Sequence, residues 1–99
     1  MNPAPDPIRE EREHAWIGDA VLALYARQWV LRERGSMDGE WFTRLTSNDF
    51  LSCFGQPTRV EARIGHVFRE EGLDAACAWI ESELLPLFLR QMAARQKKK

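Results

Sequence analysis

The chain has 99 residues, of which 44% are hydrophobic and 29% are charged, and its formal net charge is −1. This length and composition indicate one globular domain and exclude an intrinsically disordered chain. No apolar run approaches the ~20 residues of a membrane span, and the acidic N-terminus lacks the apolar core of a signal peptide. We therefore expect a cytoplasmic protein without membrane contacts. Cys53 and Cys77 stand alone in apolar patterns, which predicts buried, reduced thiols rather than a zinc site.

Apolar residues recur with helical spacing along the chain, and no segment alternates with the period of a strand, which predicts an all-α fold. Asp6 and Pro7 are a good N-cap and first helical residue, and Gly35 is a stop, so one helix is expected up to Arg34. A helix of that length spans ~40 Å. Its first turns are expected to project from the domain or to be broken.

Shorter helices are expected to follow. Asp38 can cap a helix through Leu45, and either Ser47 or Asn48 can cap another over residues 49–54. The breaker GQP at 55–57 precedes a helix from Thr58 to about Glu71. The last helix runs from Leu73 to about Arg95, with a kink or split at Pro86. The expected organisation is an N-terminal arm or first helical turn (1–10), one helical domain (11–95) and a basic tail (96–99).

Asp19 lies in the middle of residues 15–26, AWIGDAVLALYA, which are otherwise apolar on every face of a helix. Such a helix is expected to be buried on all sides. A carboxylate there costs several kcal/mol unless a cation or donor meets it. Arg12, Arg59 or Arg63 could form a structural ion pair with Asp19, whereas a bound metal ion would make it part of a functional site.

Gly18 and Gly65 stand inside apolar helical patterns, where a glycine costs about 1 kcal/mol relative to alanine. Their presence predicts a close approach of two helices, which would bring Asp19 near Glu61. Hard carboxylate oxygens favour Mg²⁺ or Mn²⁺, and such an ion can activate water and stabilise charge on a phosphodiester. Alternatively, the Thr58-x-x-Glu61 pattern can be a capping box, in which Glu61 only caps its own helix.

Several segments together resemble the ribonuclease III domain family. WIGDAVLALYARQWV is similar to its signature helix, and VEARIGHVFREEGLDAACAWI is similar to its second conserved helix and the start of the third. RLTSNDFL and ELLPLF also match the family, in order, so the resemblance covers residues 11–88. It implies a shortened ribonuclease III-like endonuclease domain that forms a two-fold homodimer. The implied activity is metal-dependent cleavage of double-stranded or structured RNA.

The resemblance implies that Asp19 and Glu61 are catalytic residues and ligands of Mg²⁺ or Mn²⁺. Ala15 and Thr58 stand where the family carries its two other acids. This pattern resembles the short Mini-III type, which lacks a double-stranded-RNA-binding domain, although the connection between the two helices is shorter here and the basic loop of that type is absent. The alternative is a catalytically inactive module that dimerises or binds RNA or a ribonucleoprotein. A helical protein-interaction domain with an accidental match is a third possibility.

Trp16 takes the place of an aromatic residue that inserts into the partner subunit in the family, which implies a dimer contact; otherwise it is a core tryptophan. Arg59 and Arg63 are possible RNA contacts. Lys97, Lys98 and Lys99 can also reach phosphates, although such a tail is usually a solvated end. His14 and His66 have no metal-like spacing and are predicted to be surface or boundary residues, with His66 a possible lining of the crevice.

Overall fold

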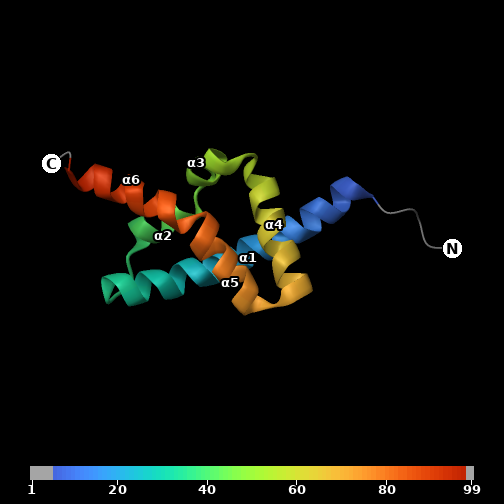
Figure 1. The fold of residues 1–99 in the computed structure, drawn as a ribbon, viewed down its shortest axis with the longest axis horizontal. Coiled ribbons are helices and arrows are strands. Elements are labelled where there is room, and N and C mark those ends of the chain that lie inside the picture. The colour runs from blue at the N-terminus through green and yellow to red at the C-terminus, as the bar shows by residue number, and fades with distance from the viewer. Residues whose placement is uncertain (1–5, 98–99) are drawn as a thin grey trace.

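The computed structural model describes residues 6–97, and these form helices and no strands (Figure 1). This confirms the all-α prediction. The elements are α1 (Pro7–Arg34), α2 (Gly39–Thr46), α3 (Asn48–Leu51), the 3₁₀ helix η1 (Ser52–Phe54), α4 (Pro57–Glu71), α5 (Leu73–Glu83) and α6 (Leu85–Lys97).

Helix α1 is continuous over its 28 residues, and local signals fix both of its ends. The Asp6 side chain accepts hydrogen bonds from the backbone N–H groups of Ile8 and Arg9. At the other end Gly35 adopts a φ of 76° and donates its N–H to the Leu31 carbonyl. The N-terminal turns of α1 extend beyond the other helices (Figure 1), which confirms that they project rather than break.

The shorter helices also begin and end close to their predicted positions. Asp38 caps α2 through the Trp41 N–H, and Ser47 caps α3 through the Phe50 N–H. The helix predicted over 49–54 is divided into α3 and η1. The predicted split near Pro86 is found between α5 and α6, because proline lacks the N–H that a continuous helix would need there.

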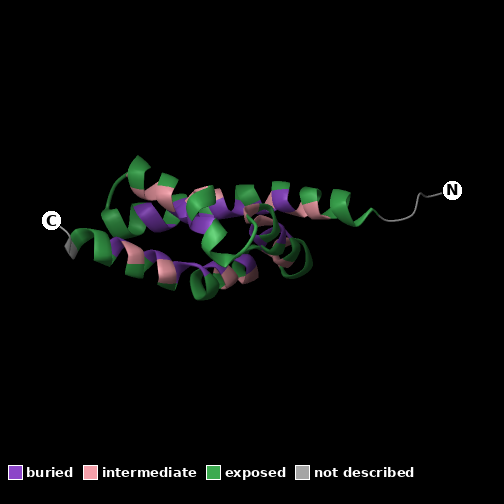
Figure 2. Cartoon of the chain, turned by 90° about the horizontal axis from the view of Figure 1, so that it is seen from above, coloured by how far each residue is buried: buried purple, intermediate pink, exposed green. Residues whose placement is uncertain are grey.

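The core lies between α1 and the helices that cross it, so each helix buries one stripe and exposes the other (Figure 2). Phe88 of α6 is at the centre of an aromatic cluster. Its ring centroid lies 5.7 Å from those of Trp29 and Trp41 and 5.6 Å from that of Phe50. These contacts join α6 to α1, α2 and α3 in one core.

Two burial predictions are wrong for the single chain. The segment 15–26 is not buried on all sides, since Asp19, Ala20 and Leu24 are exposed and the Trp16 side chain is 81% exposed. The reason is that the other helices cover only one side of α1. Cys53 is also exposed, because η1 lies at the surface, whereas Cys77 is partly buried; both are free thiols. None of the described helices has the length and apolarity to cross a membrane.

Candidate functional site

Helices α1 and α4 cross in close contact at Gly18 and Gly65. A Cβ atom added to Gly18 would overlap the Glu61 carbonyl oxygen and lie 2.8 Å from the Gly65 nitrogen. A Cβ added to Gly65 would overlap the His14 carbonyl oxygen and lie 3.0 Å from the Gly18 nitrogen. Backbone therefore meets backbone at this point, which confirms the approach predicted from the two glycines.

The crossing brings the carboxylates of Asp19 and Glu61 together. Burial, followed by the hydrogen bond to Asp19 and the charge of Asp19, raises the pKa of Glu61 to about 7. Asp19 is exposed and Glu61 is half-buried. The two acids therefore form one electrostatically linked pair at the surface of the crossing.

Two structural roles were possible for these acids, an ion pair of Asp19 with an arginine and a capping box of Thr58 with Glu61. Neither is found among the described side chains. No arginine in residues 6–96 forms an ion pair with Asp19. Helix α4 begins at Pro57 after Gln56 and has no side-chain cap, so Thr58 and Glu61 do not form a capping box. The raised pKa of Glu61 reflects its burial first and then its interaction with Asp19, and no ion pair among the described residues offsets either effect.

The pair fits a magnesium ion better than a zinc ion. Mg²⁺ is commonly held by one or two carboxylates and completes its shell with water and substrate phosphates. Ala15 is buried and Thr58 is exposed, and neither adds a carboxylate to the pair. Within the described part of the chain, no group of three or more His, Cys, Asp or Glu side chains could hold a metal.

The raised pKa of Glu61 makes stability depend on pH. In the unfolded chain the Glu61 carboxyl has its usual pKa of 4.5, whereas in the folded protein its pKa is about 7. The folded state thus binds more protons across this window, and its stability falls as pH rises through it. We expect metal-free Glu61→Gln to be more stable than the unchanged protein at pH 8, by about 1 kcal/mol after solvent screening.

Urea unfolding at pH 5 and pH 8 in EDTA checks this expectation, with Glu70→Gln, an exposed glutamate on the same helix, as the control. Equal pH dependence in Glu61→Gln and Glu70→Gln would contradict it.

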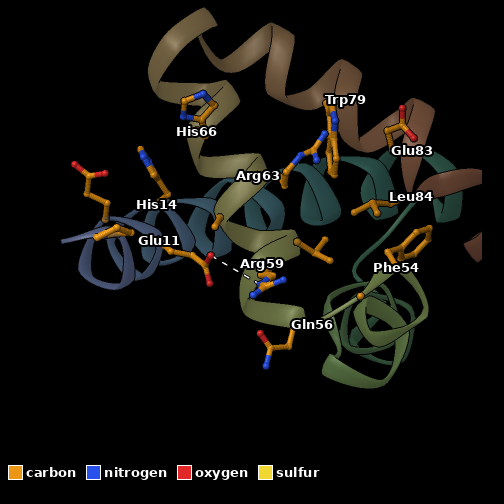
Figure 3. A pocket seen from close by; sticks show the side chains of 15 residues that line it. Glu11, His14, Phe54, Gln56, Arg59, Arg63, His66, Trp79, Glu83 and Leu84 are labelled. Carbon is orange, nitrogen blue, oxygen red and sulfur yellow. Dashed lines mark ion pairs between the residues drawn. The ribbon is translucent and has the colours of Figure 1, made fainter. Parts of the chain in front are cut away.

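A groove with a volume of about 850 Å³ lies between α1, η1, α4 and α5 (Figure 3). Arg59 and Arg63 line it from α4. Arg59 forms an ion pair with Glu11 at 4.0 Å, and the Arg63 guanidinium lies over the Trp79 ring at 5.8 Å. Neither Asp19 nor Glu61 lines this groove. The structure therefore separates the predicted basic contacts from the acidic pair, although all four side chains come from α1 and α4.

His14 and His66 line the same groove, and their ring centroids are 5.2 Å apart. The prediction that they are boundary and surface residues is confirmed, since His14 is half-buried and His66 is exposed. Their contact was not predicted from the sequence. The glycine crossing held the signal, because His14 lies one turn before Gly18 and His66 directly follows Gly65.

An apolar depression of about 630 Å³ lies beside Trp16 on the exposed side of α1, and Asp19, Leu24, Phe68 and Leu73 line part of it. Because the Trp16 side chain is exposed, the core-tryptophan alternative is wrong. The side chains of Lys97, Lys98 and Lys99 lie outside the described residues.

No family model matches the chain, and the comparisons with curated proteins and with solved structures also gave no match. The resemblance to ribonuclease III domains therefore stands on the sequence motifs quoted above.

Proposed function

We propose that this chain is a divalent-metal-dependent endoribonuclease of the ribonuclease III type, acting on double-stranded or structured RNA. The observation that carries the proposal is the α1–α4 crossing, where two glycines let the backbones touch and Asp19 adjoins Glu61. The motifs that resemble the family contain both glycines and both acids. One set of residues thus supports the resemblance and forms the acidic pair.

Asp19 and Glu61 would hold Mg²⁺ or Mn²⁺. When bound, the ion would activate water and stabilise the charge that develops on the phosphodiester. The two carboxylates bind and orient the ion. Since the pKa of Glu61 is about 7 in the metal-free protein, metal binding releases protons near neutral pH.

Double-stranded RNA is recognised through its shape, its 2′-hydroxyl groups and its phosphates. Arg59 and Arg63 are exposed on the same helix as Glu61 but line a groove apart from the acidic pair, so they are suited to contact RNA phosphates at a distance from the cleaved bond. The formal net charge of −1 supplies little long-range attraction, so these local contacts carry the affinity.

The proposed active form is a two-fold homodimer. The Trp16 side chain stands beside an apolar depression on its own chain, so the same patch on a second copy can accept it. An isologous interface of this kind would cover the side of α1 that the single chain leaves exposed. It would also place two acidic pairs on one particle, which suits the two strands of a duplex.

Trp16→Ala is expected to weaken dimerisation at least about 30-fold, because a central tryptophan is a typical hot spot. Sedimentation velocity across a dilution series measures the effect. Met37→Ala is the matched control, since Met37 is 88% exposed in the turn before α2 and lies away from the depression. If the Trp16→Ala variant dimerised as tightly as the Met37→Ala variant, the proposed interface would be wrong.

Asp19→Asn is expected to reduce metal-dependent cleavage at least about 100-fold, because it removes a charged ligand but keeps the side-chain size. The assay is cleavage of an end-labelled RNA duplex with Mg²⁺ or Mn²⁺ at low salt, where phosphate contacts are strongest. Asp49→Asn, an exposed aspartate on α3, is the control. Equal cleavage by the two variants would rule out a role for the acidic pair.

A second candidate is a catalytically inactive module of the same type that dimerises or binds RNA or a ribonucleoprotein. It is favoured by the lack, among the described residues, of a third metal-ligating side chain beside Asp19 and Glu61. The cleavage assay separates the two candidates. A folded dimer that binds the duplex without cleaving it, with either metal, would support the inactive module.

A further inference from the structure

The groove between α1, η1, α4 and α5 contains two imidazole rings in contact. The ring centroids of His14 and His66 are 5.2 Å apart, and the ring planes are inclined by 89° (Figure 3). The Nδ1 atom of His14 is buried and has no hydrogen-bond partner among the described residues. The site described above uses neither ring.

The groove also carries positive charge next to the histidines. Arg59, Arg63 and His66 follow one another at helical spacing on α4, so they share one face of that helix, and all three line the groove. The Arg59–Glu11 pair is 4.0 Å long, and its side chains are 73% and 42% exposed, so it is weak and can exchange for an anionic ligand. No ion pair holds Arg63 in the described chain.

The acidic and aromatic residues that line the groove limit which ligand it can bind. Glu10 and Glu83 also line the groove, so the cations gather on the α4 side rather than around the whole rim. Trp79 and Phe54 supply aromatic surface, on which nucleobases stack readily. Together, the groove offers cations for a phosphate, aromatic rings for a base and, towards its other end, two imidazoles (Figure 3). This combination fits a short stretch of single-stranded RNA.

We propose that His14 and His66 are a general acid–base pair that cleaves single-stranded RNA without a metal ion. The 2′-hydroxyl oxygen attacks the adjacent phosphorus while one imidazole, in its neutral form, takes the hydroxyl proton. The bond from phosphorus to the 5′-oxygen breaks, and the other imidazole, in its protonated form, gives that oxygen a proton. The products are a 2′,3′-cyclic phosphate and a 5′-hydroxyl, and exchange with water restores the two protonation states. Arg59 and Arg63 bind the phosphate.

This inference rests on the proposed function only in taking RNA as the ligand, and its chemistry is separable. The metal-dependent reaction uses water as nucleophile, needs a divalent ion and makes no cyclic phosphate. The reaction at the histidine pair continues in EDTA and needs a free 2′-hydroxyl at the cleaved position. The two activities therefore succeed or fail independently.

The test is incubation of the full chain with an end-labelled single-stranded RNA in EDTA at low salt, with product ends identified by mass spectrometry. The same strand with 2′-O-methyl groups is the substrate control. The variants are His66→Asn and His14→Asn, and Gln28→Ala, an exposed position on α1 outside the groove, is the protein control. Circular dichroism checks that each variant is folded.

We expect cyclic-phosphate products from the unmodified strand only, with a loss of about 100-fold or more in each histidine variant and none in Gln28→Ala. Because His66 is exposed, its variant keeps the test valid even if His14→Asn fails to fold. Absence of cleavage in EDTA would overturn the proposal. Cleavage that His66→Asn retains in full would also overturn it, because a contaminating nuclease or other side chains would then account for the products.

Discussion

Gly18→Ala is expected to destabilise this protein strongly, as is Gly65→Ala, because both glycines lie where the backbones of α1 and α4 meet. The new Cβ would overlap the Glu61 carbonyl oxygen and lie 2.8 Å from the Gly65 nitrogen. A flexible side chain could move aside, but these are backbone atoms of a helix packed in the core. The two helices must therefore separate, which opens gaps along the whole interface between α1 and α4.

The expected loss is at least about 3 kcal/mol, the upper end for overpacked sites, out of roughly 5–15 kcal/mol for a domain of this size. Urea denaturation followed by circular dichroism measures it. Gly39→Ala is the matched control, because a Cβ at Gly39 meets nothing within 4 Å and this residue begins α2. Normal stability of Gly18→Ala would show that α1 and α4 do not cross as described.

The same change has a functional consequence. Asp19 directly follows Gly18, and Glu61 is the residue whose carbonyl the added methyl would strike. Separating the helices thus pulls the two carboxylates apart, and the pKa of Glu61 should return toward its usual value as burial and the charge of Asp19 weaken. Close helix packing and the acidic pair are therefore two results of one structural feature.

Phe88→Ala is the second change with a large expected effect. Phe88 is 1% exposed, and its ring contacts those of Trp29, Trp41 and Phe50 edge to face. Truncation leaves a cavity among large rigid rings that cannot collapse to fill it. The expected cost is about 3–5 kcal/mol, the range for removing a phenyl ring from a core.

Leu89→Ala is the control for this prediction, because Leu89 is the next residue on α6 and is 45% exposed. Its truncation is expected to change stability by about 0.5 kcal/mol or less, as for most surface substitutions. Denaturation curves of both variants give the comparison. If Phe88→Ala cost no more than Leu89→Ala, α6 would not be joined to the core through this ring.

The sequence predicted the helix boundaries, and it predicted a close helix contact at Gly18 and Gly65 with two acids beside it. Each of these predictions depends on local signals. Asp6 and Ser47 cap helices through backbone N–H groups two or three residues away, and Gly35 ends α1 in the same short range. Pro86 divides the last helical pattern because its own nitrogen lacks a hydrogen. A glycine in an apolar helix likewise indicates a close neighbour, although it does not name the face that the neighbour covers.

Only the tertiary structure decided which face of α1 is covered by the other helices. Hydrophobicity around α1 predicted burial on all sides, yet the paths of α4, α5 and α6 cover one side and leave Trp16 and Asp19 exposed. The same paths put His14 against His66 and turn Arg59 and Arg63 toward a groove apart from the acids. The physical reason is range: caps and breakers act over one helical turn, whereas exposure and side-chain neighbours depend on how separate helices cross in space.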